Sequence, residues 1–195
     1  FMPGYPLLVL AAMKISPRFA AAVRCSVETN NGGGDASACE SYATPMRIIH
    51  ALLLAFGVVA VAIAGKIISG RKAAFWLTGA FATASLAAEA FIFSWVMTEA
   101  LTFSLYSFFA LSLVLAWTRQ RLAYSVLSGC LLAALCLTRL SFVILVPVTA
   151  LALVISSTLY GPRRKVPAAD ALAFIVAVTI ALGSWAARNA IFVGK

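Results

Sequence analysis

Three charged residues stand at the borders of long apolar segments, and they are the side chains best placed to do chemistry. Arg139 separates two such segments, Glu99 stands at the start of another, and Arg188 follows the last one. A charge at the centre of a bilayer costs about 2.5–3.5 kcal/mol on insertion scales. Each of these residues should therefore mark a helix end at the membrane boundary, or face a polar cavity that uses its charge.

The chemistry open to these residues is the binding of charged or hydroxylated groups. A guanidinium recognises phosphate oxygens through paired hydrogen bonds and stays charged when partly buried, so Arg139 and Arg188 are candidate phosphate ligands. The carboxylate of Glu99 could bind a sugar hydroxyl, an amine or a metal ion. The residues identify no cofactor with certainty, and a divalent metal ion is the one candidate.

Structural roles also explain the same three residues. Glu99, with Thr98 as N-cap, would suit the positive end of a helix dipole. Arg139 could extend its charge from a helix end into the water layer. Arg188, three residues after Trp185, could form an interfacial anchor. The residues alone leave the structural and the binding interpretations open.

The elements that must position these residues are apolar helices. The chain is 63% hydrophobic and 11% charged, whereas average soluble domains carry about 25% charged residues. This composition predicts an all-α, polytopic transmembrane helical bundle. An extracytoplasmic interfacial segment and loop is expected over 1–45, and the bundle over 46–195. We expect about six spans, at 47–66, 73–93, 98–117, 122–138, 141–160 and 168–187.

The 15 basic residues are divided between the two faces of this arrangement, which have net charges of +7 and +2. Eight of them fall in the three short connections that alternate spans would place on one face. They are Lys66, Arg71, Lys72, Arg119, Arg121, Arg163, Arg164 and Lys165. By the positive-inside rule this face is cytoplasmic, so the net charge of +9 indicates membrane topology and not nucleic-acid binding. We expect a multi-pass protein among the lipids of a bacterial inner membrane, with its active face extracytoplasmic.

The four cysteines fall into two pairs. Cys130 and Cys136 lie in an apolar segment and are interpreted as small core residues. Cys25 and Cys39 flank a polar, glycine-rich stretch. They could form a disulfide if that loop lies outside the cytoplasm.

Several short motifs occur in a recognisable order. They are Pro3 to Leu7 (Pro-Gly-Tyr-Pro-Leu), Thr98-Glu99 at the start of a span, Leu137-Thr138-Arg139 before a span with the early Pro147, and Trp185 to Asn189 at a span end. Their order resembles that of the GT-C membrane glycosyltransferases related to protein O-mannosyltransferases and the lipid A aminoarabinose transferase. The resemblance covers nearly all 195 residues.

The resemblance implies an activity. A sugar would pass from a dolichyl- or polyprenyl-phosphate carrier to an extracytoplasmic acceptor, which could be a protein, a lipid or a glycan. Arg139 and Arg188 would hold the carrier phosphate, and Glu99 and Tyr5 would join them in substrate binding. The family's general-base Asp lies upstream of the Pro-Gly-Tyr-Pro motif, so it is expected before Phe1. The chain would then be a central segment, inactive alone, with its catalytic residue outside it.

Two other classes of function stay open from the residues. A transporter or flippase-like protein would use an intramembrane charge pair, and Glu89, deep in an apolar segment, could pair with Arg139 or Arg47. A membrane scaffold subunit would need no active site. Walker A, GxSxG, paired metal-ligand His and Rossmann motifs do not occur in the sequence, so nucleotide chemistry is unsupported.

Overall fold

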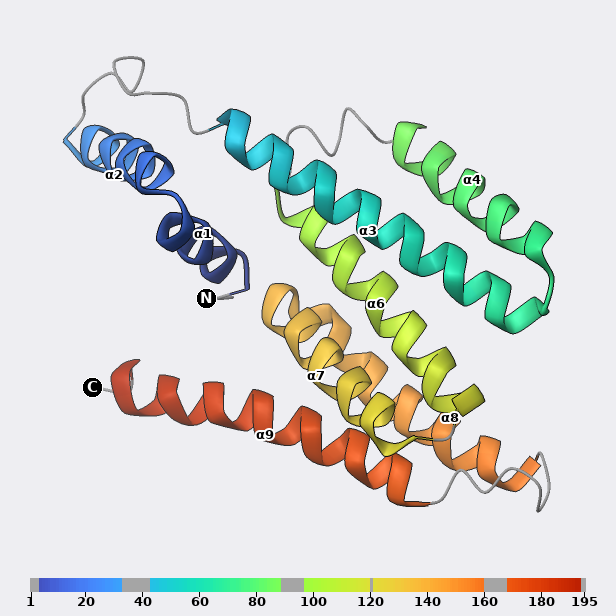
Figure 1. Ribbon diagram of the computed structural model, residues 1–195. Helices are drawn as coiled ribbons and strands as arrows, with labels where there is room; N and C mark the ends of the chain where they lie inside the picture. The colour runs from blue at the N-terminus through green and yellow to red at the C-terminus, as the bar shows by residue number, and fades with distance from the viewer. Residues whose placement is uncertain (1–3, 33–42, 89–96, 120, 160–167, 194–195) are drawn as a thin grey trace.

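The computed structural model describes residues 4–32, 43–88, 97–119, 121–159 and 168–193. Over these ranges the chain is built from helices and contains no strand, so the predicted all-α fold class is confirmed (Figure 1). The helices are α1 (Gly4–Ile15), α2 (Pro17–Asn31), α3 (Ala43–Ser69), α4 (Lys72–Ala88), α6 (Met97–Arg119), α7 (Leu122–Thr138), the 3₁₀ turn η2 (Leu140–Ile144), α8 (Leu145–Leu159) and α9 (Ala168–Val193).

Each of the six predicted spans overlaps a helix. The last helix, α9, continues to Val193, beyond the predicted end at 187, and residues 89–93 of the second span lie outside the described part of the structure. The fifth was expected as a single helix, but it begins with η2 and continues as α8. The extended backbone of Arg139 separates α7 from η2, which agrees with the predicted division between the fourth and fifth spans.

Three of these helices could cross a membrane by length and composition. They are Pro45–Ser69, Glu99–Arg119 and Ala169–Ile191. Leu122–Thr138, with 17 residues, is shorter; at about 1.5 Å per residue it reaches roughly 26 Å, a little less than a bilayer core of about 30 Å. The apolar helices indicate a membrane protein, and the number of spans stays a prediction.

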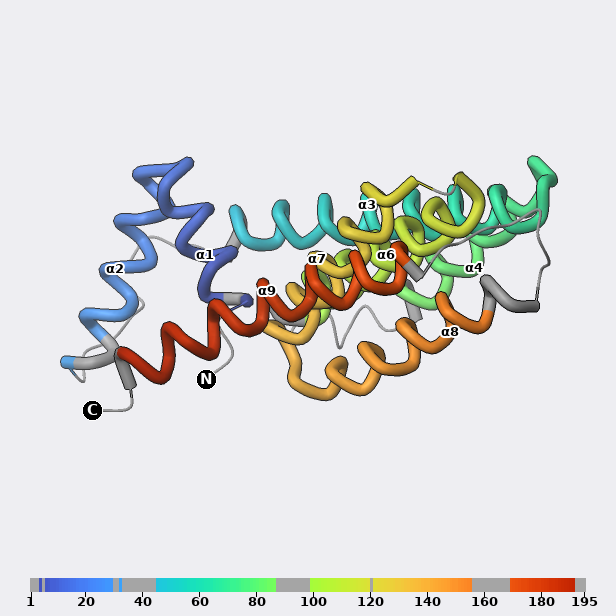
Figure 2. The backbone as a smooth tube through the Cα atoms, turned by 90° about the horizontal axis from the view of Figure 1, so that it is seen from below, coloured from blue at the N-terminus to red at the C-terminus, as the bar shows by residue number. Residues whose placement is uncertain are grey.

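The long helices run side by side in an alternating, up-and-down order (Figure 1). Helix α3 packs between α4 and α6. Helix α6 also packs against α7, and α7 packs against α9. Helix α8 also contacts α9, and Figure 2 shows it on the opposite side of the bundle from α3. Helices α1 and α2 lie at one end, where α1 contacts α7.

Small residues let these helices approach closely. A Cβ at Gly57 on α3 would come within 2.7 Å of the Phe103 ring on α6. A Cβ at Gly129 on α7 would come within 2.6 Å of the carbonyl oxygen of Phe174 on α9. Interfaces of this kind are usual where helices associate inside lipid, because apolar side chains gain little there by leaving the lipid tails.

Buried polar side chains join the central helices. The hydroxyl groups of Ser112 on α6 and Ser128 on α7 lie 3.0 Å apart and are hydrogen-bonded. The hydroxyl of Ser125 on α7 donates to the carboxylate of Asp170 on α9 at 3.0 Å, and both residues are buried. The three central helices therefore share polar contacts as well as the apolar cluster around Leu132, Leu135 and Phe174.

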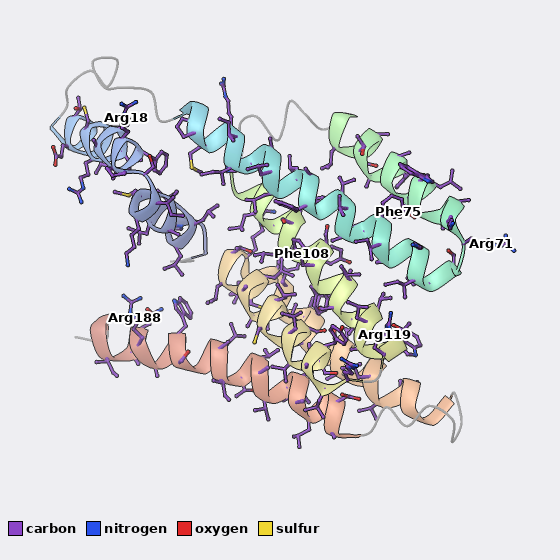
Figure 3. The ribbon with its side chains drawn as sticks, in the orientation of Figure 1. Arg18, Arg71, Phe75, Phe108, Arg119 and Arg188 are labelled. Atoms are coloured by element: carbon purple, nitrogen blue, oxygen red, sulfur yellow. The ribbon has the colours of Figure 1, made fainter. Side chains whose placement is uncertain are left out.

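The alternation of the helices separates the charged residues by bundle end. Figure 3 shows Arg71 and Arg119 at one end and Arg188 at the other. Glu99, in the first turn of α6, and Arg139, at the end of α7, share the end of Arg188. The described basic residues of the predicted cytoplasmic face thus lie opposite the candidate binding residues.

Candidate functional site

The centre of the candidate site is an ion pair between two helix ends. The Nη2 group of Arg139 donates a hydrogen bond to Oε1 of Glu99, forming a salt bridge between α7 and α6. The side chain of Arg139 is 45% exposed and that of Glu99 is 24% exposed. The pair is therefore neither buried in the bundle nor fully solvated, and the Arg139 guanidinium can be reached from outside.

The backbone around Arg139 is fixed on both sides. Arg139 has an extended conformation (φ −147°, ψ 121°), and its N–H donates to the carbonyl oxygen of Leu135 at 2.9 Å. Its own carbonyl accepts the N–H of Phe142 at 3.2 Å, the first bond of the following 3₁₀ turn. The Arg139 side chain thus extends from a short backbone segment that is hydrogen-bonded to the helix before it and to the 3₁₀ turn after it. This limits the positions that its guanidinium can take.

The residue before the arginine anchors the N-terminal segment. Thr138 is buried, and its hydroxyl donates to the Leu135 carbonyl at 2.6 Å. A Cβ at Gly4 would come within 2.6 Å of Cγ2 of Thr138 and 3.1 Å of the Leu137 carbonyl oxygen. A side chain at position 4 would collide with α7, so glycine permits α1 to pack there.

This contact brings together two of the short motifs, which lie far apart in the sequence. Gly4 belongs to the Pro-Gly-Tyr-Pro stretch, and Thr138 belongs to the Leu-Thr-Arg stretch. The side chain of Tyr5 lies outside the described part of the structure. The helix that carries Tyr5 nevertheless begins beside the junction that carries Arg139.

Arg188 lies at the same bundle end on a different helix. It occupies the C-terminal turns of α9, is exposed, and projects from the side of α9 that faces α1 in Figure 3. The structure therefore joins Glu99 to Arg139 directly and places Arg188 on a separate helix of the same end.

Other sequence-derived candidates have different outcomes. Glu89, expected to pair with Arg139 or Arg47, lies outside the described residues, and the partner that Arg139 has is Glu99. Cys25 takes part in a disulfide, but Cys39 lies outside the described residues, so their pairing stays a prediction. Within the described ranges Cys130 and Cys136 are free thiols.

Two features were not found from the sequence. The first is the pairing of Glu99 with Arg139. The signal available was that alternating spans place both residues on the face opposite the eight basic residues of the short connections. The second is Asp170, whose carboxylate is buried and accepts a hydrogen bond from Ser125. Its position in the first turn of an apolar helix was the available signal.

The described residues offer oxygen and guanidinium ligands and no preformed metal cluster. Among them, no three His, Cys, Asp or Glu side chains come together in a way that could hold a metal ion. The arrangement can bind an anion at Arg139, with Glu99 beside it. No protein-family model, curated protein or solved structure matches this chain.

Proposed function

We propose that this chain is a segment of an integral-membrane glycosyltransferase that moves a sugar from a polyprenyl-phosphate carrier to an extracytoplasmic acceptor. The observation that carries the proposal is the Glu99–Arg139 pair at a bundle end, held by a fixed backbone junction and reachable from outside. A lipid-linked phosphate lies at that depth in a membrane. The membrane would be the inner membrane of a bacterium, with this bundle end facing outward.

Arg139 supplies the positive charge in this proposal. The acceptor hydroxyl attacks the anomeric carbon of the sugar, the bond from that carbon to the phosphate oxygen breaks, and the proton passes to a base. Negative charge then develops on the departing polyprenyl phosphate, and a fixed guanidinium stabilises it. Glu99 engages Nη2 of Arg139 and holds the side chain in place. The base in this proposal is the Asp that the family resemblance implies.

The position of the pair favours this class over a transporter. An intramembrane charge path would need ionisable groups within the depth of the bundle. Glu99 and Arg139 lie instead at helix ends. An anion at the level of lipid headgroups fits that position, and Arg188 on α9 adds a second positive charge to the same end.

The test compares two variants that break the same ion pair in the full-length protein. Glu99→Ala and Arg139→Ala each remove the salt bridge, so both should lose a similar amount of thermal stability. Arg139→Ala should also lower sugar transfer from a polyprenyl-phosphate sugar by at least about tenfold, because it removes the phosphate ligand. Glu99→Ala should lower transfer much less.

Arg119→Ala is the matched control, because Arg119 is an exposed arginine at a helix end on the other side of the bundle. It should leave transfer unchanged. If the Arg139→Ala variant transfers sugar as fast as the unaltered protein, Arg139 does not bind the carrier phosphate. A full-length protein that transports the carrier and never cleaves it would exclude the transferase.

A further inference from the structure

The connection between α3 and α4 forms a basic depression at the bundle end opposite Arg139. It is lined by Lys66, Lys72, Phe75 and Trp76, is open to the outside, and has a volume of about 220 Å³. Neither α3 nor α4 contains an acidic residue, and Arg71 lies in the turn between them. The depression therefore has positive charge and an aromatic wall, and no carboxylate on its own helices offsets that charge.

A tight turn brings the two lysines together. Gly70 has a positive φ of 69°, and its N–H donates to the carbonyl oxygen of Lys66 at 2.9 Å, which ends α3. The N–H of Arg71 donates to the hydroxyl oxygen of Ser69 at 3.2 Å, just before α4 begins at Lys72. The turn thus places the last turn of one helix and the first residue of the next at one site.

Close packing holds the two helices in this geometry. A Cβ at Gly65, the residue before Lys66, would come too close to Oγ1 of Thr78, so α3 and α4 touch beside the depression. Because α3 and α4 pack this closely, the packing of the helices sets the separation of Lys66 and Lys72.

Lys72 is the first residue of α4, where a positive side chain is unfavourable to the helix dipole. A bound anion would offset that repulsion.

The aromatic wall indicates that the anion comes from a membrane lipid. Phe75 and Trp76 meet edge to face with ring centroids 5.2 Å apart, and Trp76 is 73% exposed. Exposed tryptophans at span ends lie at the headgroup level of a bilayer, and the depression adjoins the end of the candidate span Pro45–Ser69. Its size is below the roughly 300–1,000 Å³ of pockets for whole drug-sized ligands, so it suits a headgroup.

We propose that Lys66, Lys72 and the Phe75–Trp76 pair bind the phosphate headgroup of an anionic phospholipid at the α3–α4 turn. The two ammonium groups contact the phosphate oxygens, and the aromatic rings lie against the adjoining glycerol and acyl region. The site is separate from the Glu99–Arg139 pair and does not depend on the proposed transferase activity.

The test measures binding of phosphatidylglycerol to the purified protein by native mass spectrometry, with phosphatidylcholine as the neutral comparison. Lys66→Gln/Lys72→Gln should weaken phosphatidylglycerol binding by about 25-fold, because each lysine near an anionic headgroup contributes roughly a fivefold factor. Lys66→Arg/Lys72→Arg should restore binding. Thermal unfolding of each variant checks that the fold is retained.

Arg119→Gln/Arg121→Gln is the matched control, since it removes the same charge from exposed residues of the same bundle end. It should change binding by less than about threefold if the depression is the site. Equal losses in both double variants, or no loss in either, would overturn the proposal. Displacement of the lipid by an equal concentration of inorganic phosphate would show a free-phosphate site and overturn the lipid assignment.

Discussion

At the scale of single residues, Arg139 forms a salt bridge with Glu99 among the described residues. Arg139 engages Glu99 through one guanidinium nitrogen. A guanidinium has five N–H donors, so one contact leaves capacity for a phosphate. The ion pair and the phosphate site are therefore compatible, and the carboxylate would orient the arginine without occupying it fully.

The contribution of this pair to stability should be small. A double-mutant cycle of Glu99→Ala and Arg139→Ala is expected to give a coupling energy of about 0.2–1 kcal/mol, because the partly exposed pair is screened by solvent. The measurement is thermal unfolding of the purified protein at low and high salt. A coupling above about 3 kcal/mol, unchanged by salt, would contradict this and indicate a buried structural pair.

At the scale of helices, glycine decides how closely α7 and α9 approach. Gly129 faces the backbone of Phe174, whereas Gly183 on α9 would place a Cβ in open space. Both lie within helices, so alanine at either should favour the helix by up to about 1 kcal/mol. Only at Gly129 must the neighbouring backbone move to make room.

These two glycines form a matched test of the α7–α9 contact. Gly129→Ala should lower the free energy of unfolding by about 1–3 kcal/mol through overpacking, and Gly183→Ala should leave it unchanged or raise it slightly. Unfolding with increasing denaturant in detergent measures both. Equal stability of the two variants would mean that α7 and α9 do not pack through Gly129.

The buried Ser125–Asp170 hydrogen bond gives a second test of the same interface. Ser125→Ala removes a hydroxyl that donates to the buried carboxylate of Asp170. The variant should be destabilised by about 1–3 kcal/mol, because a buried acceptor loses its donor. The control is Thr118→Ala, whose hydroxyl bonds only within its own helix and is exposed; it should change the unfolding midpoint little.

At the scale of the whole molecule, the alternating helices place two chemically different ends on one bundle. Ser69 lies at the end that carries Lys66, Arg71, Lys72, Arg119 and Arg121, and Ser141 lies beside Arg139 at the other. Both are exposed. If the positive-inside rule sets the orientation, the first end faces the cytoplasm and the second faces outward.

Cysteine labelling in intact cells checks this orientation. In a background with Cys130→Ser and Cys136→Ala, Ser141→Cys should react with a membrane-impermeant thiol reagent and Ser69→Cys should react only after the cells are opened. The reverse pattern would invert the topology. Labelling of both positions from outside would show that Ser69 and Ser141 do not lie on opposite faces of a membrane.

Much of the helical arrangement could be predicted from the sequence. Apolar segments of this length, each ended by charged residues or a turn, have few alternatives to the α-helix, because in lipid the backbone must form its hydrogen bonds within each segment. Basic residues in alternate connections then predicted which charged residues lie at each end of the bundle. Both the helices and the separation of Arg71 from Arg139 agree with that prediction.

The tertiary structure alone decided which residues meet at those ends. Glu99 and Arg139 are separated by 40 residues and Gly4 lies on a different helix from Thr138. Their contacts depend on how each helix is rotated and how far it is shifted along its neighbour. Rotation and shift follow from small-residue packing at positions such as Gly129, where a single methyl group matters. The sequence by itself determined which helices form and where charge lies, and packing determined which charges pair.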